Sequence, residues 1–553
     1  MRSLVLITFT LPLLLACTDG SDNRIAEEDL LPFLSYMGTP QPRGGQCEEG
    51  VDVDAPLIVS GFGFNARNTR NIDSIIDSSN VHELQLNYRF SPAGANEKRG
   101  APAVTAQAIF ATSGRTLHAL NRLSGCEYWS YTSAEGASSF RSGSILFVPK
   151  SADTPAMIFA GDFNSYVHAL DAASGELLWR THVGTHDFFH FVTGGMQYHE
   201  GRLFVPVSSK EVLATLVFPG TCCTTHGMLV ALDAGTGAIL WEYHTTADAT
   251  EVVFPGQRIG PNGAAVWATP TLDPARNAVY IGTAQNYTEP LTQTSDAIIS
   301  LDMDDGAVNW IFQARSDDAW NGNCAIPGSL KCADPQGYDF DFGAAPILLD
   351  DGETIIAGDK GGIVYSIAAA SGALNWSTRV SLGSTLGGIH WGMAVDDRRV
   401  YVAATDFSIE KATGGIADLV EGALPGIYAL DLDTGAIDWE IHPTHQYEGL
   451  TTPSLFSASL SVSNDVLFGG SLDGVVRAFS TVDGAELWSL HSAEAFTDIN
   501  GVPGNGGTID SVGVVVAGDG ILVNSGYSTF QGVDGRYQRG AGNALYVLRL
   551  SGQ

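Results

Sequence analysis

Lysine is scarce in this 553-residue chain: six lysines accompany 22 arginines, against 61 acidic residues, and the net charge is −33. A surface this negative repels the phosphates of nucleic acids and anionic lipid headgroups, which excludes nucleic-acid binding. Charged residues make up only 16% and hydrophobic residues 44% of the chain, which excludes disorder over most of its length. Beyond the first twenty residues no apolar run is long enough to span a bilayer.

The N-terminus has the form of a targeting segment. Arg2 precedes the largely apolar run Leu4–Ala16, which is too short for a membrane span and is typical of a secretory signal. The sequence Leu-Leu-Ala-Cys ending at Cys17 resembles a bacterial lipobox, and a plain signal peptide with an incidental cysteine is the alternative. We expect residues 1–17 to be a signal peptide with a lipobox. The protein would then be exported to the periplasm, with the outer membrane contacted only through a lipid on Cys17.

The other six cysteines form an even set, which in an oxidising compartment indicates disulfides. Cys324 and Cys332 are eight residues apart and are expected to pair, which leaves Cys47 with Cys126. The adjacent residues Cys222 and Cys223 either stay reduced, close a strained ring with each other, or enter two separate bridges. The chain contains no C-x-x-C-H motif, so no c-type haem is attached to it.

A repeat sets the expected fold. A β-rich strand ending in Ala-Leu-Asp or a similar triplet, a glycine turn and a tryptophan recur seven times. Neighbouring tryptophans are 49 to 69 residues apart, at Trp129, Trp179, Trp241, Trp310, Trp376, Trp439 and Trp488. A truncated eighth copy ends the chain at residues 544–552. Repeats of this kind predict an all-β, eight-bladed β-propeller. It would cover residues 59–553 after a linker at 18–58, with residues 84–90 supplying the last strand of the eighth blade.

The repeat resembles the tryptophan-docking motif of the quinoprotein alcohol dehydrogenases, which bind pyrroloquinoline quinone (PQQ) on the propeller axis. Residues 61–70, the Cys222-Cys223 pair, the segment ending at Trp267 and the segment 318–321 resemble the polyvinyl alcohol dehydrogenase branch. This resemblance runs from Val59 to the C-terminus. It implies a PQQ-dependent enzyme that oxidises alcohols.

The resemblance also implies a set of cofactor-binding residues. A Cys222–Cys223 disulfide would cover one face of the flat quinone and Trp267 the other. Arg141 and Lys360 would meet its anionic edge, with Lys360 also taking a catalytic part beside the quinone oxygens. His390 and Trp391 match a polar–tryptophan pair near the cofactor, and Thr193 is a candidate hydroxyl contact. Purely structural roles are the alternatives: a solvated turn lysine, a buried histidine and a blade-packing tryptophan.

The metal of the family is Ca²⁺, which prefers oxygen ligands. The resemblance places Glu211, Asn286 and Asp318 as its ligands, while a solvated glutamate and a turn asparagine are the alternatives. The catalytic base is where this sequence departs from many relatives. Asn321 stands at the catalytic position where methanol and glucose dehydrogenases carry an aspartate, and an amide cannot accept a proton as a base. Asp318, with Asp317 as second candidate, is therefore the predicted base.

Two functions of different classes remain in competition. The first is a PQQ- and Ca²⁺-dependent dehydrogenase of secondary or polymeric alcohols that passes electrons to a separate c-type cytochrome, with a sugar as an alternative substrate. The second is a non-catalytic propeller lipoprotein that acts as a scaffold in outer-membrane assembly. The vicinal cysteines, Trp267 and Lys360 favour the enzyme, because a scaffold requires none of them.

Overall fold

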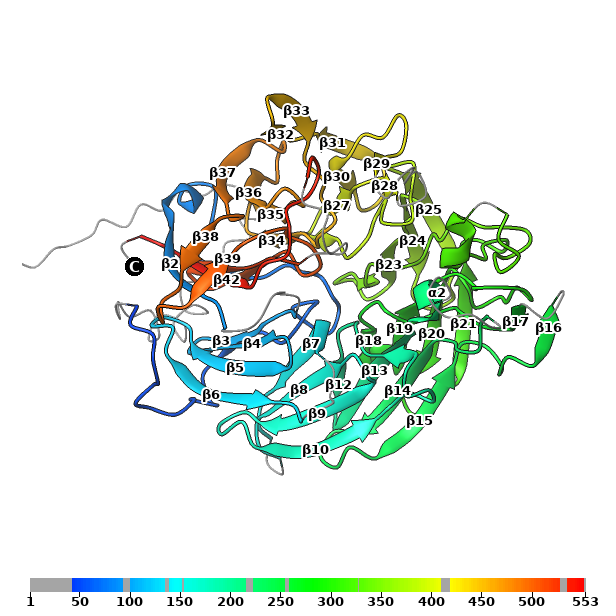
Figure 1. The fold of residues 1–553 in the computed structure, drawn as a ribbon, viewed down its shortest axis with the longest axis horizontal. Helices are drawn as coiled ribbons and strands as arrows, with labels where there is room; N and C mark the ends of the chain where they lie inside the picture. The colour runs from blue at the N-terminus through cyan, green and yellow to red at the C-terminus, as the bar shows by residue number, and fades with distance from the viewer. Residues whose placement is uncertain are drawn as a thin grey trace, which may run out of the picture.

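The computed structural model describes residues 42–92, 100–134, 139–151, 154–214, 222–253, 258–326, 328–408, 418–527 and 535–551. These residues form eight main antiparallel sheets around a common axis (Figure 1), which confirms the all-β, eight-bladed propeller. Among them, helix is limited to η1 (Val81–Glu83), α2 (Glu211–Ala214), η2 (Pro274–Arg276) and η3 (Gly322–Ala325). No helix within the described ranges is long and apolar enough to cross a membrane. The predicted signal peptide with Cys17, and residues 18–41 of the linker, lie outside the described residues.

The first four blades follow one another along the chain. Within each blade, the strand nearest the propeller axis comes first in the chain and the outermost strand comes last. Blade 1 contains β1 (Leu57–Val59), β3 (Ala103–Thr105), β4 (Ala108–Ser113), β5 (Thr116–Asn121) and β6 (Glu127–Thr132). Blade 2 contains β7 (Phe140–Val148), β8 (Met157–Asp162), β9 (Tyr166–Asp171) and β10 (Leu177–His182). Blade 3 contains β11 (His190–Phe191), β12 (Gln197–His199), β13 (Arg202–Ser209), β14 (Met228–Asp233) and β15 (Ile239–His244). Blade 4 contains β18 (Thr271–Asp273), β19 (Ala278–Gly282), β20 (Ala297–Asp302) and β21 (Val308–Gln313).

The remaining blades repeat the same order, except that the outermost strand of blade 8 comes from the N-terminal part of the chain. Blade 5 contains β22 (Ile347–Leu348), β23 (Thr354–Gly358), β24 (Ile363–Ala368) and β25 (Leu374–Arg379). Blade 6 contains β26 (Ala394–Val395), β27 (Arg399–Ala404), β30 (Gly426–Asp431) and β31 (Ile437–Ile441). Blade 7 contains β34 (Ser461–Ser463), β35 (Val466–Gly470), β36 (Val475–Ser480) and β37 (Glu486–His491). Blade 8 contains β40 (Val514–Ala517), β41 (Gly520–Ser525), β42 (Ala544–Leu550) and β2 (Leu84–Phe90).

In the described loops between these strands lie four small hairpins. They are β16 (Glu251–Val253) with β17 (Arg258–Gly260), β28 (Phe407–Ser408) with β29 (Asp418–Leu419), β32 (Thr444–Tyr447) with β33 (Leu450–Pro453), and β38 (Ala495–Thr497) with β39 (Pro503–Asn505). Because the strands of a blade are antiparallel, its connections alternate between the two faces of the ring. The turns that join the first to the second and the third to the fourth strand lie on what we call the short-turn face. The second-to-third and blade-to-blade connections lie on the long-loop face.

The tryptophans of the repeat join neighbouring blades. Trp129 on β6 donates its indole N–H to the carbonyl of Ala172 in the next blade at 3.1 Å. Five more repeat tryptophans donate in the same way at 3.0 or 3.1 Å: Trp179, Trp241, Trp310, Trp376 and Trp439. The turn glycine is required at this contact, because Gly175 has a φ of +74° and a Cβ there would lie 2.5 Å from Cε3 of Trp129. The repeat therefore encodes the interface between blades.

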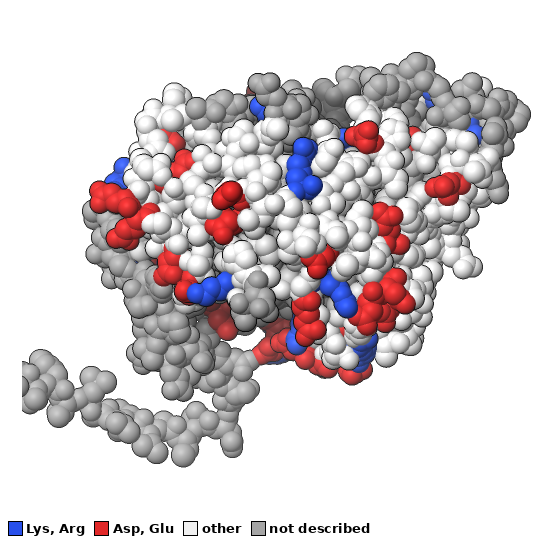
Figure 2. Space-filling view, turned by 90° about the horizontal axis from the view of Figure 1, so that it is seen from below, with Lys and Arg blue, Asp and Glu red and all other residues white. Residues whose placement is uncertain are grey.

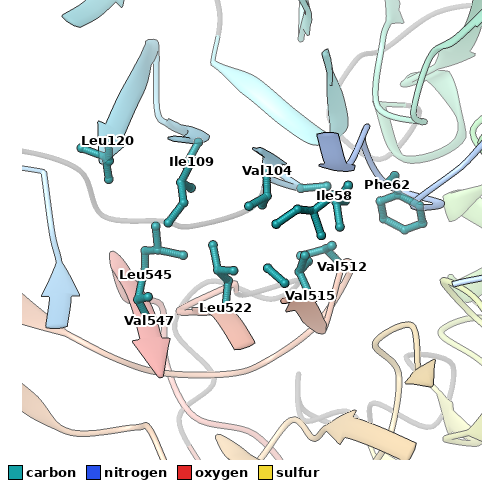
Figure 3. Packing of buried hydrophobic residues seen from close by; sticks show 14 of the residues in the cluster. Ile58, Phe62, Val104, Ile109, Leu120, Val512, Val515, Leu522, Leu545 and Val547 are labelled. Carbon is teal, nitrogen blue, oxygen red and sulfur yellow. The ribbon is translucent and has the colours of Figure 1, made fainter. Parts of the chain in front are cut away.

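The ring closes between the two ends of the propeller. Strand β2 pairs with β42, from Leu84 opposite Leu550 to Phe90 opposite Leu545, as the sequence predicted (Figure 1). Buried side chains of blades 1 and 8 pack together across this seam, among them Val104 and Ile109 against Leu522 and Leu545 (Figure 3). Closure by a strand from the N-terminal part gives blade 8 four strands and pairs the outer edge of β42.

The charge of the chain is distributed over the surface. Figure 2 shows acidic side chains scattered over one side of the molecule, with fewer basic ones between them. A groove of about 760 Å³ opens on the short-turn face, between residues 65–73 and turn aspartates such as Asp350 and Asp396. Residues of the predicted site do not line this groove, so it is separate from the chemistry considered below.

Candidate active site

The predicted site residues come from different blades but gather on the long-loop face. Lys360 follows β23, Glu211 follows β13 and Asn286 follows β19, so these three lie in second-to-third-strand connections. Blade-to-blade connections carry Trp267, Asp318 with Asn321, and His390 with Trp391, while Thr193 lies between β11 and β12 of blade 3. Arg141 lies in strand β7, and its side chain is outside the described part of the structure.

Trp267 is held by polar and aromatic contacts. Its Nε1 donates a hydrogen bond of 3.0 Å to Oδ2 of Asp341. The rings of His390 and Trp391 meet it at centroid distances of 5.7 and 5.3 Å, with interplanar angles of 68° and 85°. Gly343 is required beside it, because a Cβ there would overlap the indole ring. The half-buried ring is therefore fixed in one orientation, as a stacking wall must be.

The structure contains the three disulfides expected from the sequence: Cys47–Cys126, Cys324–Cys332 and Cys222–Cys223. The vicinal pair is thus bonded to itself, which decides between the alternatives left open above. Its two residues are buried in a cluster with Ala265, Ala284 and Tyr287, and Trp267 packs against the same cluster. The predicted wall and the predicted cover therefore lie in one part of the molecule.

Lys360 is buried between two carboxylates that the sequence analysis did not single out. Its Nζ lies 3.1 Å from Oδ2 of Asp339 and 3.2 Å from Oδ2 of Asp341. Burial alone would lower the pKa of Lys360, but the two carboxylates together raise it above its usual value. The ammonium is also 5.9 Å from the centroid of the Trp267 ring. A permanently positive group therefore lies beside the stacking wall.

No motif in the segment Asp339-Phe340-Asp341-Phe342 marks the two aspartates as partners of a distant lysine. Asp339 has a φ of +64°, so the strict side-to-side alternation of a strand does not describe this segment. A second missed group is Asp296, just before β20. Its carboxylate is fully buried, and neither oxygen has a hydrogen-bond partner among the described residues. Burial first, and then the charges of Asp318, Asp341 and Asp359, raise the pKa of Asp296 well above its usual range.

His390 and Trp391 supply further polar atoms to the site. Nδ1 of His390 lies 2.8 Å from the hydroxyl of Ser457. Burial, with a smaller contribution from the charge of Lys360, lowers the pKa of His390 to about 3, so the ring is neutral at ordinary pH. The indole N–H of Trp391 is buried without an acceptor in the described part of the chain. An unpaired buried donor costs about 1–3 kcal/mol, which a bound acceptor would recover.

These features fit a flat anionic quinone such as PQQ. Such a group requires flat apolar walls, which Trp267 and the Cys222–Cys223 cluster provide. Its carboxylates and quinone oxygens require a cation and hydrogen-bond donors, and Lys360 and the unpaired N–H of Trp391 are of those types. Thr193 is buried in the same region: its neighbour Gly194 packs so closely on the carbonyl of Trp267 that a Cβ would lie 2.7 Å from it.

Asp318 organises the loop that carries the two new carboxylates. Its Oδ1 accepts the N–H groups of Tyr338 at 2.7 Å and Asp339 at 3.1 Å, and Oδ2 accepts that of Phe340 at 3.1 Å. Burial raises the pKa of Asp318, although these three backbone bonds oppose the shift. Asn321 is the N-cap of η3: its side chain accepts the N–H of Asn323 and donates to the carbonyls of Tyr287 and Lys331.

The predicted metal ligands are already engaged by protein groups. Glu211 accepts the backbone N–H groups of Thr224 at 2.8 Å and Thr225 at 2.6 Å, and Asn286 accepts that of Thr292 at 2.8 Å. The described ranges contain no group of three or more His, Cys, Asp or Glu side chains that could hold a metal ion. The arrangement of these side chains does not by itself form a calcium site, and we derive no chemical step through a metal.

The fold and this site together define a propeller oxidoreductase that uses a quinone cofactor. The profile of the "Glucose/ethanol/alcohol dehydrogenase, beta-propeller domain" family matches residues 71–373, and that of "Outer membrane protein assembly factor BamB" matches residues 298–533. A polyvinylalcohol dehydrogenase of Sphingopyxis sp. (strain 113P3) is 34% identical, over 94% of this chain and 81% of the relative. One from a Pseudomonas species is also 34% identical, over 91% of this chain and 78% of the relative.

Solved structures agree on the fold. A quinohemoprotein alcohol dehydrogenase from Pseudomonas putida HK5 superposes with a TM-score of 0.66 at 16% identity, covering 91% of this chain and 81% of that one. A europium-containing methanol dehydrogenase gives the same TM-score at 18% identity, over 90% of this chain and 99% of the other. The chain belongs to the PQQ-dependent quinoprotein alcohol dehydrogenase family. Among its relatives, the polyvinyl alcohol dehydrogenases match it over most of its length.

Proposed function

We propose that this enzyme oxidises secondary alcohol groups, including those of a polyhydroxylated chain such as polyvinyl alcohol. The observation that carries the proposal is the joint placement of Trp267, the Cys222–Cys223 cluster and the Lys360–Asp341 pair on the long-loop face. The names of the two relatives that are 34% identical support the polymeric substrate. A sugar remains the alternative, because substrate choice depends on loop shape.

Each residue of the site has a proposed role in binding the cofactor. When bound, PQQ supplies the acceptor for the two electrons that leave the alcohol carbon. Trp267 and the disulfide would hold its flat faces, and Lys360, from between Asp339 and Asp341, would donate hydrogen bonds to its oxygens and stabilise negative charge there. Arg141, His390, Trp391 and Thr193 are the further proposed contacts. Their common role is to orient the cofactor and to exclude water from it.

Asp318 is the proposed base that takes the hydroxyl proton of the alcohol. Its Oδ2 accepts one described hydrogen bond, from Phe340, which leaves acceptor capacity on that oxygen. A pKa raised by burial also brings the carboxylate closer to the working pH, where a general base is most effective. Asn321 cannot take this role, and its hydrogen bonds place it at the start of η3.

Calcium, the electron acceptor and the location complete the proposal. Glu211, Asn286 and Asp318 are the proposed calcium ligands, and their present hydrogen bonds would have to rearrange around the ion. Electrons would leave to a separate c-type cytochrome, because the chain has no haem attachment motif. The predicted leader at residues 1–17 is the basis for the proposed export to the periplasm, with a lipid on Cys17 as the proposed anchor.

A scaffold function explains less of the structure. The match to the assembly factor covers residues 298–533, which does not include Cys222, Cys223 or Trp267. A scaffold function gives no reason for a buried lysine between two carboxylates beside Trp267, or for a vicinal disulfide in the cluster against which Trp267 packs. The test is to load the purified protein with PQQ and calcium and to follow dye reduction by propan-2-ol, by glucose and by polyvinyl alcohol. Reduction by the alcohols supports the proposal, and no reduction with any of the three contradicts it.

A further inference from the structure

The exposed large apolar side chains fall into two groups. One group lies on or beside the outer strands of the blades, for example Leu178 on β10 and Leu240 on β15, which are 43% and 48% exposed. The other group lies in connections of the long-loop face, and it includes Tyr338, Leu382 and Leu424, which are 63%, 47% and 60% exposed. Exposed apolar groups that cluster around a reaction site mark a binding surface.

The connections that carry Phe340, Gly361 and Leu382 meet at the backbone of Gly361. Gly361, the neighbour of Lys360, is so close to Phe340 that a Cβ would lie 2.9 Å from its Cδ2. A Cβ on Gly383, which follows Leu382, would lie 2.7 Å from Cα of Gly361. Loop segments 338–340 and 382–383 therefore flank the residue next to the buried lysine.

Contacts extend this surface on both sides. The ring of Tyr338 stacks on that of Phe340, with centroids 5.2 Å apart and an interplanar angle of 19°. On the other side, a Cβ on Gly422 would lie 3.9 Å from Cδ1 of Leu382, and Leu424 follows two residues later. We call Tyr338, Phe340, Leu382 and Leu424 the apolar rim.

We propose that the apolar rim binds the hydrocarbon backbone of a polymeric alcohol while one of its hydroxyl groups enters the site beside Lys360. This inference rests on the proposed function and adds to it a binding surface outside the reaction site. The rim is continuous with the site, because Gly361 lies against the loops that carry Phe340 and Leu382 and is bonded to Lys360.

The negative charge of the protein favours an uncharged polymeric alcohol over an anionic polymer at the apolar rim. Polyvinyl alcohol is uncharged, so the net charge of −33 does not repel it, while it would repel an anionic polymer. Its chain alternates CH₂ and CHOH groups, so one strand offers hydroxyls to the site and apolar surface to the rim. A small alcohol cannot reach both, and the rim should therefore distinguish long from short substrates.

The test compares a rim variant with a matched surface variant. Tyr338→Ser with Leu382→Ser removes two rim side chains, and Leu178→Ser with Leu240→Ser removes two leucines of the outer strands. We expect kcat/KM for polyvinyl alcohol, relative to that for pentane-2,4-diol, to fall about tenfold in the rim variant, from the apolar area that is lost. The outer-strand variant should keep the ratio of the unaltered enzyme. A second rim variant, Tyr338→Phe with Leu382→Met, keeps the surface apolar. It should also keep the kcat/KM ratio of the unaltered enzyme.

A binding measurement separates this inference from the proposed function. The cofactor-free protein should bind polyvinyl alcohol in a calorimetric titration, and the rim variant should bind it about tenfold more weakly, with or without any dehydrogenase activity. Equal binding by the two proteins overturns the inference. An equal loss of rate with polymer and diol also overturns it and assigns the rim to the electron acceptor. A change in sedimentation coefficient caused by the rim substitutions overturns it in favour of contact between copies of this chain.

Discussion

Oδ2 of Asp341 lies 3.2 Å from Nζ of Lys360, and this oxygen also accepts the indole N–H of Trp267 at 3.0 Å. One carboxylate atom therefore sets the distance between the aromatic wall and the buried cation of the site. The other oxygen of Asp341 accepts the backbone N–H of Gln285 at 3.4 Å. This connects the pair to the loop of blade 4 that also carries Asn286.

The first prediction concerns Asp341. Asp341→Asn removes the charge from this junction, so Trp267 and Lys360 keep at most a neutral amide oxygen as their common partner. We expect the affinity for PQQ to fall about tenfold, because a hydrogen bond to a charged group is worth about 1.5–3 kcal/mol. Quenching of tryptophan fluorescence during titration with PQQ measures this. Asp334→Asn, an exposed aspartate in the same long loop, is the control, and equal affinity in the two variants would refute the role of Asp341.

The second prediction separates the two kinds of tryptophan. Trp267→Ala removes a stacking wall worth about 1–3 kcal/mol, by analogy with base stacking, so PQQ should bind roughly 5- to 150-fold more weakly. Trp129→Ala removes a blade-docking side chain instead, and should lower the melting temperature with little effect on PQQ affinity. Both quantities are measured on both variants. The same pattern of effects in the two proteins would show that Trp267 is only another packing tryptophan.

The third prediction concerns the base. Asp318→Asn should lower turnover about 10²- to 10⁴-fold, the range expected for loss of general base catalysis. PQQ affinity should stay nearly unchanged. The melting temperature should drop, because the new NH₂ group must face a backbone N–H of the loop 338–340 that the carboxylate accepted. Near-normal turnover would move the base role to another carboxylate, with Asp317 and Asp339 as the next variants to measure.

The fourth prediction is a pH dependence of stability. The folded state lowers the pKa of His390 from 6.5 to about 3, through burial first and the charge of Lys360 second. Between these values the unfolded chain binds a proton that the folded chain does not, so this residue makes stability fall as the pH falls from 6.5 towards 3. His390→Gln should reduce the slope of unfolding free energy against pH by about 1.4 kcal/mol per pH unit in that window. Parallel curves for the two proteins, measured by urea unfolding, would contradict the assignment.

The fold could be predicted from the sequence almost completely. The repeat places a tryptophan and a turn glycine at fixed spacing, and both are needed at the same contact between blades, as Trp129 and Gly175 show. The closing strand at residues 84–90 was also predictable, because the last repeat lacks its outer strand and only the N-terminal part could supply it.

The site could be predicted only in part. Trp267, Lys360 and the vicinal cysteines were visible through motifs, but Asp341 and Asp339 carry no motif of their own. Their importance arises from loops of different blades that meet only in the folded ring. The engagement of Glu211 by the N–H groups of residues 224 and 225 was hidden for the same reason, since it depends on how one loop folds back.

The central claim is that this propeller holds PQQ between Trp267 and the Cys222–Cys223 disulfide. The most direct measurement is the amount of quinone that stays with the purified protein after incubation with PQQ and gel filtration, read from its absorbance. The account predicts one PQQ per chain in the unaltered protein and a clear loss of it in the Trp267→Ala variant. Elution of all the quinone apart from the unaltered protein would contradict the account.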